Sequence, residues 1–166
     1  MKKIGLILLA CINVLTLIAQ DYEKDFREIQ GLFLERANTT QARLSQHLDT
    51  YPYSPYSDEI NLLQGVLEVE KDKYSQALKI FTEVNPKNLS RTSENMFHFY
   101  MGYTYLSLDK YEEALSTLRP LKQKQNPYFL QATYYIGYCY YKQNLYPQAL
   151  SEFLSLEDLG GYQRIA

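Results

Sequence analysis

Few residues in this chain have the types and spacing that active-site chemistry requires. His47 and His98 each lack a second histidine or cysteine three or four residues away, the usual spacing of a helical metal site. Cys139 lies between two tyrosines with no histidine near it in sequence, so a buried, unreactive thiol is expected. The sequence has no phosphate-binding loop, nucleophile elbow or metal motif. We therefore expect no catalytic, cofactor-binding or metal-binding residues, and both histidines to be structural or surface residues.

The strongest pattern in the sequence is a repeat. The stretch YSQAL at 74–78 recurs as YEEAL at 111–115 and as YPQAL at 146–150, in steps of 37 and 35 residues. Each alanine follows a glycine by twelve residues and precedes a large apolar residue by four; the three sets are Gly65, Ala77, Phe81; Gly102, Ala114, Leu118; and Gly137, Ala149, Phe153. A period near ~34 residues with this spacing is typical of a helical repeat array.

The elements that carry these residues are predicted to be helices only. Apolar residues recur every three or four positions, and glycine, proline and polar turns separate the runs. Helices are expected at about 21–36, 40–50, 55–70, 74–85, 92–107, 111–119, 127–142 and 146–157. Three short turns, 71–73, 108–110 and 143–145, join neighbouring helices. The sequence predicts an all-α fold, an α-α superhelix of about four antiparallel helix pairs.

The repeated residues have expected roles in packing. The glycines let the two helices of a pair approach closely, and the alanines are the matching small positions on the second helix. Tyr74, Tyr111 and Tyr146 open the second helices and are expected to cover the turns. Phe81, Leu118 and Phe153 are expected to fill the gap between successive pairs. Ala42 lies 35 residues before Ala77, which makes residues 20–54 a degenerate first pair.

The N-terminal residues have the pattern of an export signal. Lys2 and Lys3 precede an apolar run, 4–19, that ends in a small residue, so a signal peptide over residues 1–19 is predicted. The sixteen residues of this run reach about 24 Å as a helix, short of the ~30 Å of a bilayer core, which disfavours an uncleaved anchor. A lipoprotein cleaved before Cys11 is the minor alternative.

Composition after removal of this leader limits the class of partner. The 17 basic residues fall to 15 against 19 acidic ones, a formal net charge of −4 with no basic cluster. A nucleic-acid partner is therefore not expected, nor is membrane insertion after cleavage. The mature chain keeps one cysteine, Cys139, so it has no internal disulfide despite the export signal.

Together these residues resemble the tetratricopeptide repeat (TPR) family, well over 55–161 and weakly over 21–54. The match includes the glycines, the alanines, Phe81, Phe153 and the first-helix tyrosines Tyr105 and Tyr140. The departures are Asn61, His98 and Thr133 where the family favours tryptophan, Glu68 in place of a tyrosine, and Leu89, Asn126 and Gly161 where proline is common. The resemblance divides the mature chain into a degenerate pair at 20–54, repeats at 55–91, 92–126 and 127–161, and the start of a further helix at 162–166.

What the resemblance implies is a superhelix whose concave face is lined by the first helix of each pair. The family's groove positions fall on Leu62, Val66, Phe99, Tyr103, Tyr134, Tyr138 and Tyr141. The lysines and asparagines with which some TPR domains grip a peptide carboxylate are absent, so an apolar or aromatic-rich partner segment is expected. The same stripe is also consistent with packing between repeats, and both readings stay open.

The expected function is binding without catalysis. With its leader, the chain resembles exported TPR proteins of the Gram-negative cell envelope, and we expect a scaffold for a protein or peptide in the periplasm or at the outer membrane. The alternative is the regulatory or scaffolding N-terminal arm of a longer enzyme or of a transport or secretion assembly, with its activity beyond residue 166. Self-association through the C-terminal end is a further expectation, because no polar capping helix follows the last repeat.

Overall fold

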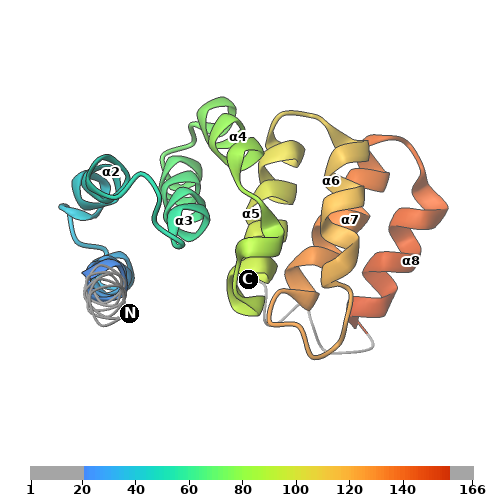
Figure 1. Cartoon of the computed structure of the whole chain (residues 1–166). Helices are drawn as coiled ribbons and strands as arrows, with labels where there is room; N and C mark the ends of the chain where they lie inside the picture. The colour runs from blue at the N-terminus through green and yellow to red at the C-terminus, as the bar shows by residue number, and fades with distance from the viewer. Residues whose placement is uncertain (1–20, 158–166) are drawn as a thin grey trace, which may run out of the picture.

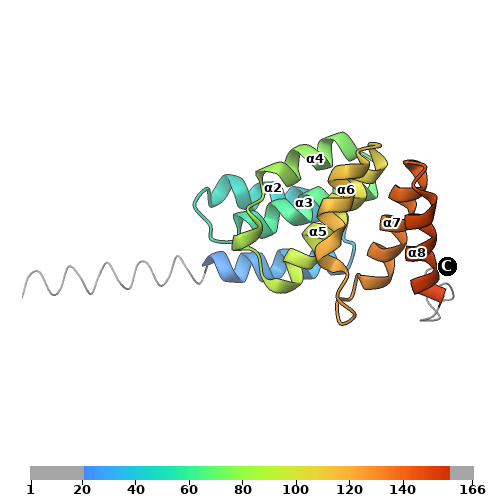
Figure 2. The same ribbon diagram turned by 90° about the vertical axis from the view of Figure 1, so that its right-hand side faces the viewer.

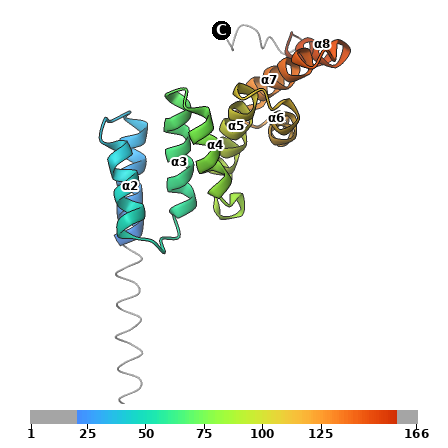
Figure 3. The same ribbon diagram turned by 90° about the horizontal axis from the view of Figure 1, so that it is seen from above.

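The computed structural model describes residues 21–157, which fold into α-helices and short 3-10 helices with no β-strand in that range. After a first helix over residues 21–34 come α2 (Thr40–Thr50), α3 (Ser57–Glu70), α4 (Tyr74–Glu83), η1 (Pro86–Asn88), α5 (Arg91–Ser107), α6 (Tyr111–Leu118), η2 (Arg119–Leu121), α7 (Phe129–Lys142) and α8 (Tyr146–Glu157). Helices that follow one another pack side by side in pairs (Figures 1 and 2), and the pairs succeed one another along an arc (Figure 3). The predicted all-α superhelix of helix pairs is confirmed.

The predictions for both chain ends lie outside the described residues. These are the signal peptide over residues 1–19, the alternative cleavage at Cys11, and the start of a further helix at 162–166. Within residues 21–157, no helix is both long enough and apolar enough to cross a membrane.

A repeated polar contact closes the turn of each of the last three pairs. The turn residues Asp72, Asp109 and Asn144 have positive φ angles of 57°, 58° and 62°, a region where aspartate and asparagine are better tolerated than most residues. Two residues later, the tyrosine that opens the second helix donates its hydroxyl hydrogen bond back to that turn side chain, in the pairs Tyr74–Asp72, Tyr111–Asp109 and Tyr146–Asn144. The predicted role of these tyrosines in covering the turn is confirmed.

The three repeat glycines each face a large side chain of their own pair. A Cβ atom added at Gly102 would lie 2.6 Å from the Cγ of Leu118, and the same contact joins Gly65 to Phe81 and Gly137 to Phe153. The prediction that the large residues fill the gap between successive pairs is therefore incomplete. Each of these large side chains occupies the space that the glycine of its own helix pair leaves open. Phe81 also reaches the next pair, where its ring centroid lies 6.0 Å from that of Phe97 on α5.

Buried side chains form three core clusters, and each cluster spans a helix pair together with the first helix of the following pair. The first joins helix 21–34 and α2 to α3 through Phe26, Ile29, Leu44, Ile60 and Leu63. The second joins α3 and α4 to Phe97 on α5. The third joins α5, α6 and η2 to Ala132, Ile136 and Cys139 on α7. The core of one pair is therefore completed by the next pair.

Two first helices begin two residues later than predicted. The expected starts at Pro55 and Pro127 become Ser57 and Phe129, because a Ser-Pro-Tyr or Asn-Pro-Tyr segment forms a turn first. In each turn the polar side chain accepts the N–H of the tyrosine, Ser54 from Tyr56 at 3.2 Å and Asn126 from Tyr128 at 2.9 Å. Each tyrosine then stacks on a phenylalanine of the preceding first helix, with centroid distances of 4.5 Å for Tyr56–Phe26 and 4.6 Å for Tyr128–Phe99.

The first pair follows a different register from the predicted one. Ala42 is exposed, whereas Ala77 is fully buried. Near Ala42, Thr40 at the start of α2 is buried instead, and its hydroxyl donates to the carbonyl oxygens of Leu32 and Ala37 at 3.0 and 2.7 Å. Thr40 therefore ties the start of α2 to the end of the preceding helix by hydrogen bonds to backbone.

Candidate functional site

Aromatic side chains from α5 and α7 meet at the seam between the second and third repeats. The ring of Tyr103 lies 5.2 Å from that of Tyr135, and Tyr135 in turn lies 6.0 Å from Phe99 and 5.5 Å from Tyr134. Tyr74 of α4 extends the row on the other side of Tyr103, at 6.1 Å. Rings at these separations attract one another beyond the area that they bury, so the row holds α5 against α7.

A hollow of about 450 Å³ opens beside this row. Its wall consists of tyrosine rings, and its polar groups come from the C-terminal ends of the two helices; the lining residues are Tyr103, Leu106, Ser107, Asp109, Tyr134, Tyr135, Tyr138 and Lys142. The ammonium group of Lys142 lies 6.0 Å from the centre of the Tyr138 ring. The hollow therefore combines aromatic faces with one carboxylate and one cationic group.

The seven predicted groove residues do not share one environment. Leu62 and Val66 are fully buried in the core cluster that joins α3 and α4 to α5, so they cannot contact a partner, and this part of the predicted groove is wrong. The physical reason is coverage by the next pair, which seals these aliphatic side chains against Phe97.

The other five predicted residues retain exposed surface. Phe99, Tyr103 and Tyr134 are half-buried in the aromatic row, whereas Tyr138 and Tyr141 are exposed. Three of the five, Tyr103, Tyr134 and Tyr138, line the hollow. The structure thus brings together the later part of the predicted stripe. It also shows that Phe99 serves in packing between repeats, stacked on Tyr128.

Ionisable groups in this region are shifted toward their neutral forms. Burial raises the pKa of Tyr135, with a smaller contribution from Tyr103. Burial also raises the pKa of the Cys139 thiol to about 12, and its side chain is enclosed in the core cluster. A tyrosine or thiol with a raised pKa keeps its proton at neutral pH, so these groups supply surface and hydrogen bonds and no nucleophile.

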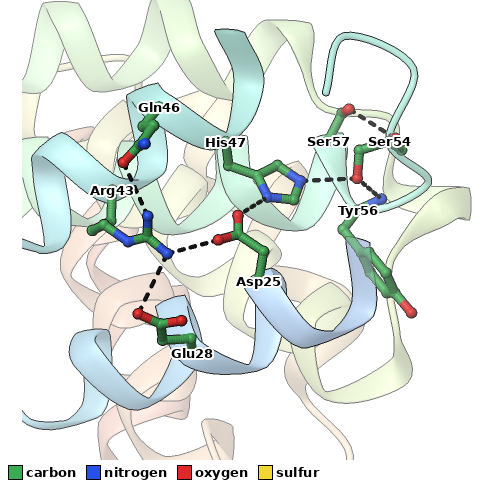
Figure 4. A network of polar contacts seen from close by, with 8 residues as sticks. All are labelled: Asp25, Glu28, Arg43, Gln46, His47, Ser54, Tyr56 and Ser57. Carbon is green, nitrogen blue, oxygen red and sulfur yellow. Dashed lines mark hydrogen bonds and ion pairs between the residues drawn. The ribbon is translucent and has the colours of Figure 1, made fainter. Parts of the chain in front are cut away.

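A buried polar network that the sequence analysis missed joins the first pair to the connection after it (Figure 4). His47 is buried, and its Nδ1 lies 2.6 Å from Asp25 Oδ2 on the first helix, while its Nε2 lies 2.9 Å from Ser54 Oγ. Arg43 donates to the other oxygen of Asp25 at 2.6 Å. The spacing of Thr40, Leu44 and His47 along α2 could have predicted the burial, because these residues share the helix face that packs on the core.

An aspartate, a histidine and a serine bonded in this order can activate a serine hydroxyl in hydrolytic enzymes. Here the His47 side chain has no exposed surface, and the Ser54 hydroxyl is also occupied by the N–H of Tyr56. No face of the imidazole is open to a substrate. The network pairs both ring nitrogens and ties three segments together, so its contribution is to stability.

The second histidine lies at a larger, polar hollow of about 720 Å³ between the N-terminal part of α5 and the segment before α7. Partial burial lowers the pKa of His98, against a smaller opposing effect of Glu94. The side-chain amide of Asn126 donates to the side-chain oxygen of Asn95 across this region at 2.9 Å. In residues 21–157, histidine, cysteine, aspartate and glutamate side chains do not gather in groups of three that could hold a metal ion.

Comparison with protein-family models, with curated proteins and with solved structures gave no match to this chain. The arguments about its function therefore rest on the repeat, the packing and the tyrosine-lined hollow between α5 and α7.

Proposed function

We propose that the protein is a non-catalytic scaffold of the TPR type that binds a protein or peptide partner in the cell envelope. The observation that carries the proposal is the tyrosine-lined hollow between α5 and α7. Tyrosine offers a large rigid ring at a small entropic cost and keeps a hydroxyl for hydrogen bonding, which is why it is enriched where proteins bind one another.

The hollow suits an extended segment that places one apolar or aromatic side chain between the rings of Tyr103 and Tyr134. Asp109 and Lys142 lie at its polar end and are positioned to meet the amide groups or the charges that flank such a side chain. The apolar leader and the absence of a basic cluster in the sequence support an exported protein that binds polypeptide rather than nucleic acid.

The test is recovery of partners from an envelope extract on immobilised full-length protein. A Tyr103→Ala/Tyr134→Ala variant removes two walls of the hollow, and Lys142→Glu reverses the charge at its rim without touching the packed row. Tyr53→Ala, at an exposed ring on the connection before α3, is the matched control. We expect the first two variants to lose the partner several-fold and the control to retain it.

Helical circular dichroism and thermal unfolding establish that each variant is folded before recovery is compared. Equal recovery by wild type and by both hollow variants, all folded, would refute the proposed site. The export part of the proposal has its own test, which is N-terminal sequencing of protein recovered from the envelope. A start near Gln20 supports the signal peptide, and a start at Cys11 replaces it with a lipoprotein.

A further inference from the structure

The two charged residues that line the hollow between α5 and α7 come from different helices. Asp109 lies two residues after the end of α5, and Lys142 is the last residue of α7. Both side chains are exposed. Within residues 21–157, neither forms an ion pair with the other or with any further residue. The hollow therefore has one negative and one positive group that a ligand can meet.

A tyrosine fixes the position of each charge. The hydroxyl of Tyr111 donates to Asp109 Oδ1, and this hydrogen bond raises the pKa of Tyr111 to about 12, so the phenol keeps its proton and continues to donate at neutral pH. The ammonium group of Lys142 lies 6.0 Å from the centre of the Tyr138 ring, whose face attracts a cation. Charges that are already held in place lose less conformational freedom when a ligand binds.

The combination of opposite charges distinguishes this seam from the one before it. One repeat earlier, the positions of Asp109 and Lys142 are held by Asp72 and Ser107. The turn explains the carboxylate, because Asp72 and Asn144 accept the same tyrosine hydrogen bond in their own pairs. The turn does not explain the lysine. Of these two seams, only the one between α5 and α7 therefore adds a cation to the turn carboxylate.

We propose that the polypeptide segment bound in the hollow carries a basic residue on one side of its anchoring side chain and an acidic residue on the other. This assignment rests on the proposed function, because it names the chemistry of the partner that the hollow binds. The basic group meets Asp109 and the acidic group meets Lys142, with the anchor between the rings of Tyr103 and Tyr134.

Charge complementarity favours this segment over the alternatives. Covering the hollow removes water from Asp109 and Lys142, and two apolar flanks would leave both charges without a partner. Two acidic flanks would place like charges together at Asp109, and two basic flanks would do so at Lys142. Only flanks of opposite charge match both groups. Because both residues are exposed, each match contributes modestly and weakens as salt is added.

The probe is a phage-displayed library of random twelve-residue peptides, panned on immobilised full-length protein. Clones that also bind folded Tyr103→Ala/Tyr134→Ala are removed, so the remaining clones depend on the hollow. We expect these clones to share an aromatic or large apolar residue with a basic residue on one side and an acidic residue on the other. Panning on Lys142→Glu should instead select basic residues on both sides.

Fluorescence anisotropy of one selected, synthetic peptide then measures each charge contact. Asp109→Asn and Lys142→Gln are each expected to weaken binding about two- to fivefold, the range of an exposed ion pair. Asparagine preserves the turn, because Asn144 accepts the equivalent tyrosine hydrogen bond one repeat later. A peptide whose acidic residue is replaced by lysine should bind Lys142→Glu more tightly than it binds wild type.

The repeat supplies two matched controls that leave binding unchanged. Asp72→Asn makes the same substitution at the same turn position of the preceding pair, outside the hollow. Lys110→Gln removes an ammonium group that also lies 6.0 Å from the centre of a tyrosine ring but does not line the hollow.

The outcomes separate this assignment from the proposed function. Hollow-dependent peptides that lack the two charges, or equal affinity of a selected peptide for wild type, Asp109→Asn and Lys142→Gln, overturn the assignment and leave the proposed site standing. If no clone depends on Tyr103 and Tyr134, the site and the assignment both fall. A dimer in sedimentation velocity that Tyr103→Ala/Tyr134→Ala dissociates would make a second copy the occupant and would also overturn the assignment.

Discussion

Replacing Gly102 by alanine tests the packing rule on which the repeat depends. The added Cβ atom would lie 2.6 Å from both Cγ and Cδ2 of Leu118. Real Cβ atoms do not approach other heavy atoms so closely, so Leu118 or one of the two helices has to move. Leu118 is fully buried in the core cluster, and its Cγ is not a free end that could swing aside.

Two opposing effects determine how much Gly102→Ala changes the free energy of unfolding. Alanine is a better helix former than glycine by about 0.5–1 kcal/mol. Overpacking of a close-packed core costs about 1–3 kcal/mol, and a clash at Cγ belongs in the upper part of that range. We therefore expect Gly102→Ala to lower the free energy of unfolding by about 1–2 kcal/mol.

The assay is urea unfolding followed by circular dichroism at 222 nm. Gly31→Ala is the matched control, because Gly31 is also helical but has no atom within 4 Å of the added Cβ, and this variant is expected to gain about 0.5–1 kcal/mol. In a Leu118→Ala background the clash is absent, so Gly102→Ala should become stabilising. Equal effects of alanine at Gly102 and at Gly31 would refute the packing argument.

Three further predictions concern stability and reactivity. His47→Gln leaves Asp25 or Ser54 without its buried partner and should cost about 1–3 kcal/mol in urea unfolding, while the half-buried His98→Gln should change the unfolding free energy little. Tyr128→Ala removes the ring stacked at 4.6 Å on Phe99 and is expected to cost about 1–3 kcal/mol; an unchanged urea midpoint would contradict it. Burial raises the pKa of the Cys139 thiol to about 12, so native protein at pH 8 should react with a thiol reagent only at its rate of unfolding.

The raised pKa of the Cys139 thiol also predicts that the stability of the protein depends on pH. The unfolded thiol loses its proton near its ordinary pKa of about 8.5, whereas the folded thiol retains the proton to much higher pH. The contribution of Cys139 to stability is therefore complete below that ordinary value and is lost as the pH rises toward 12. A Cys139→Ser variant should show a smaller fall in urea midpoint between pH 8 and pH 10 than the wild type.

Local physical chemistry allowed the sequence to determine the helices and their order. A helix depends on spacing and on turn residues near it in the chain, and for this reason the starts at Tyr74, Tyr111 and Tyr146 were predictable to the residue. The starts at Ser57 and Phe129 were displaced because Ser54 and Asn126 bond to backbone in a turn before the helix begins. The choice between a cap and such a turn depends on the tertiary partners of those side chains.

Only the tertiary structure decided which members of the repeated apolar stripe are accessible. Leu62 and Tyr134 hold the same repeat position, yet the first is sealed by the following pair and the second retains exposed surface. Burial at such a position depends on a helix more than thirty residues away, so no local pattern reports it. The contact of Asp25 with His47 has the same origin, since two residues that local patterns treat separately become partners only when the first helix and α2 pack together.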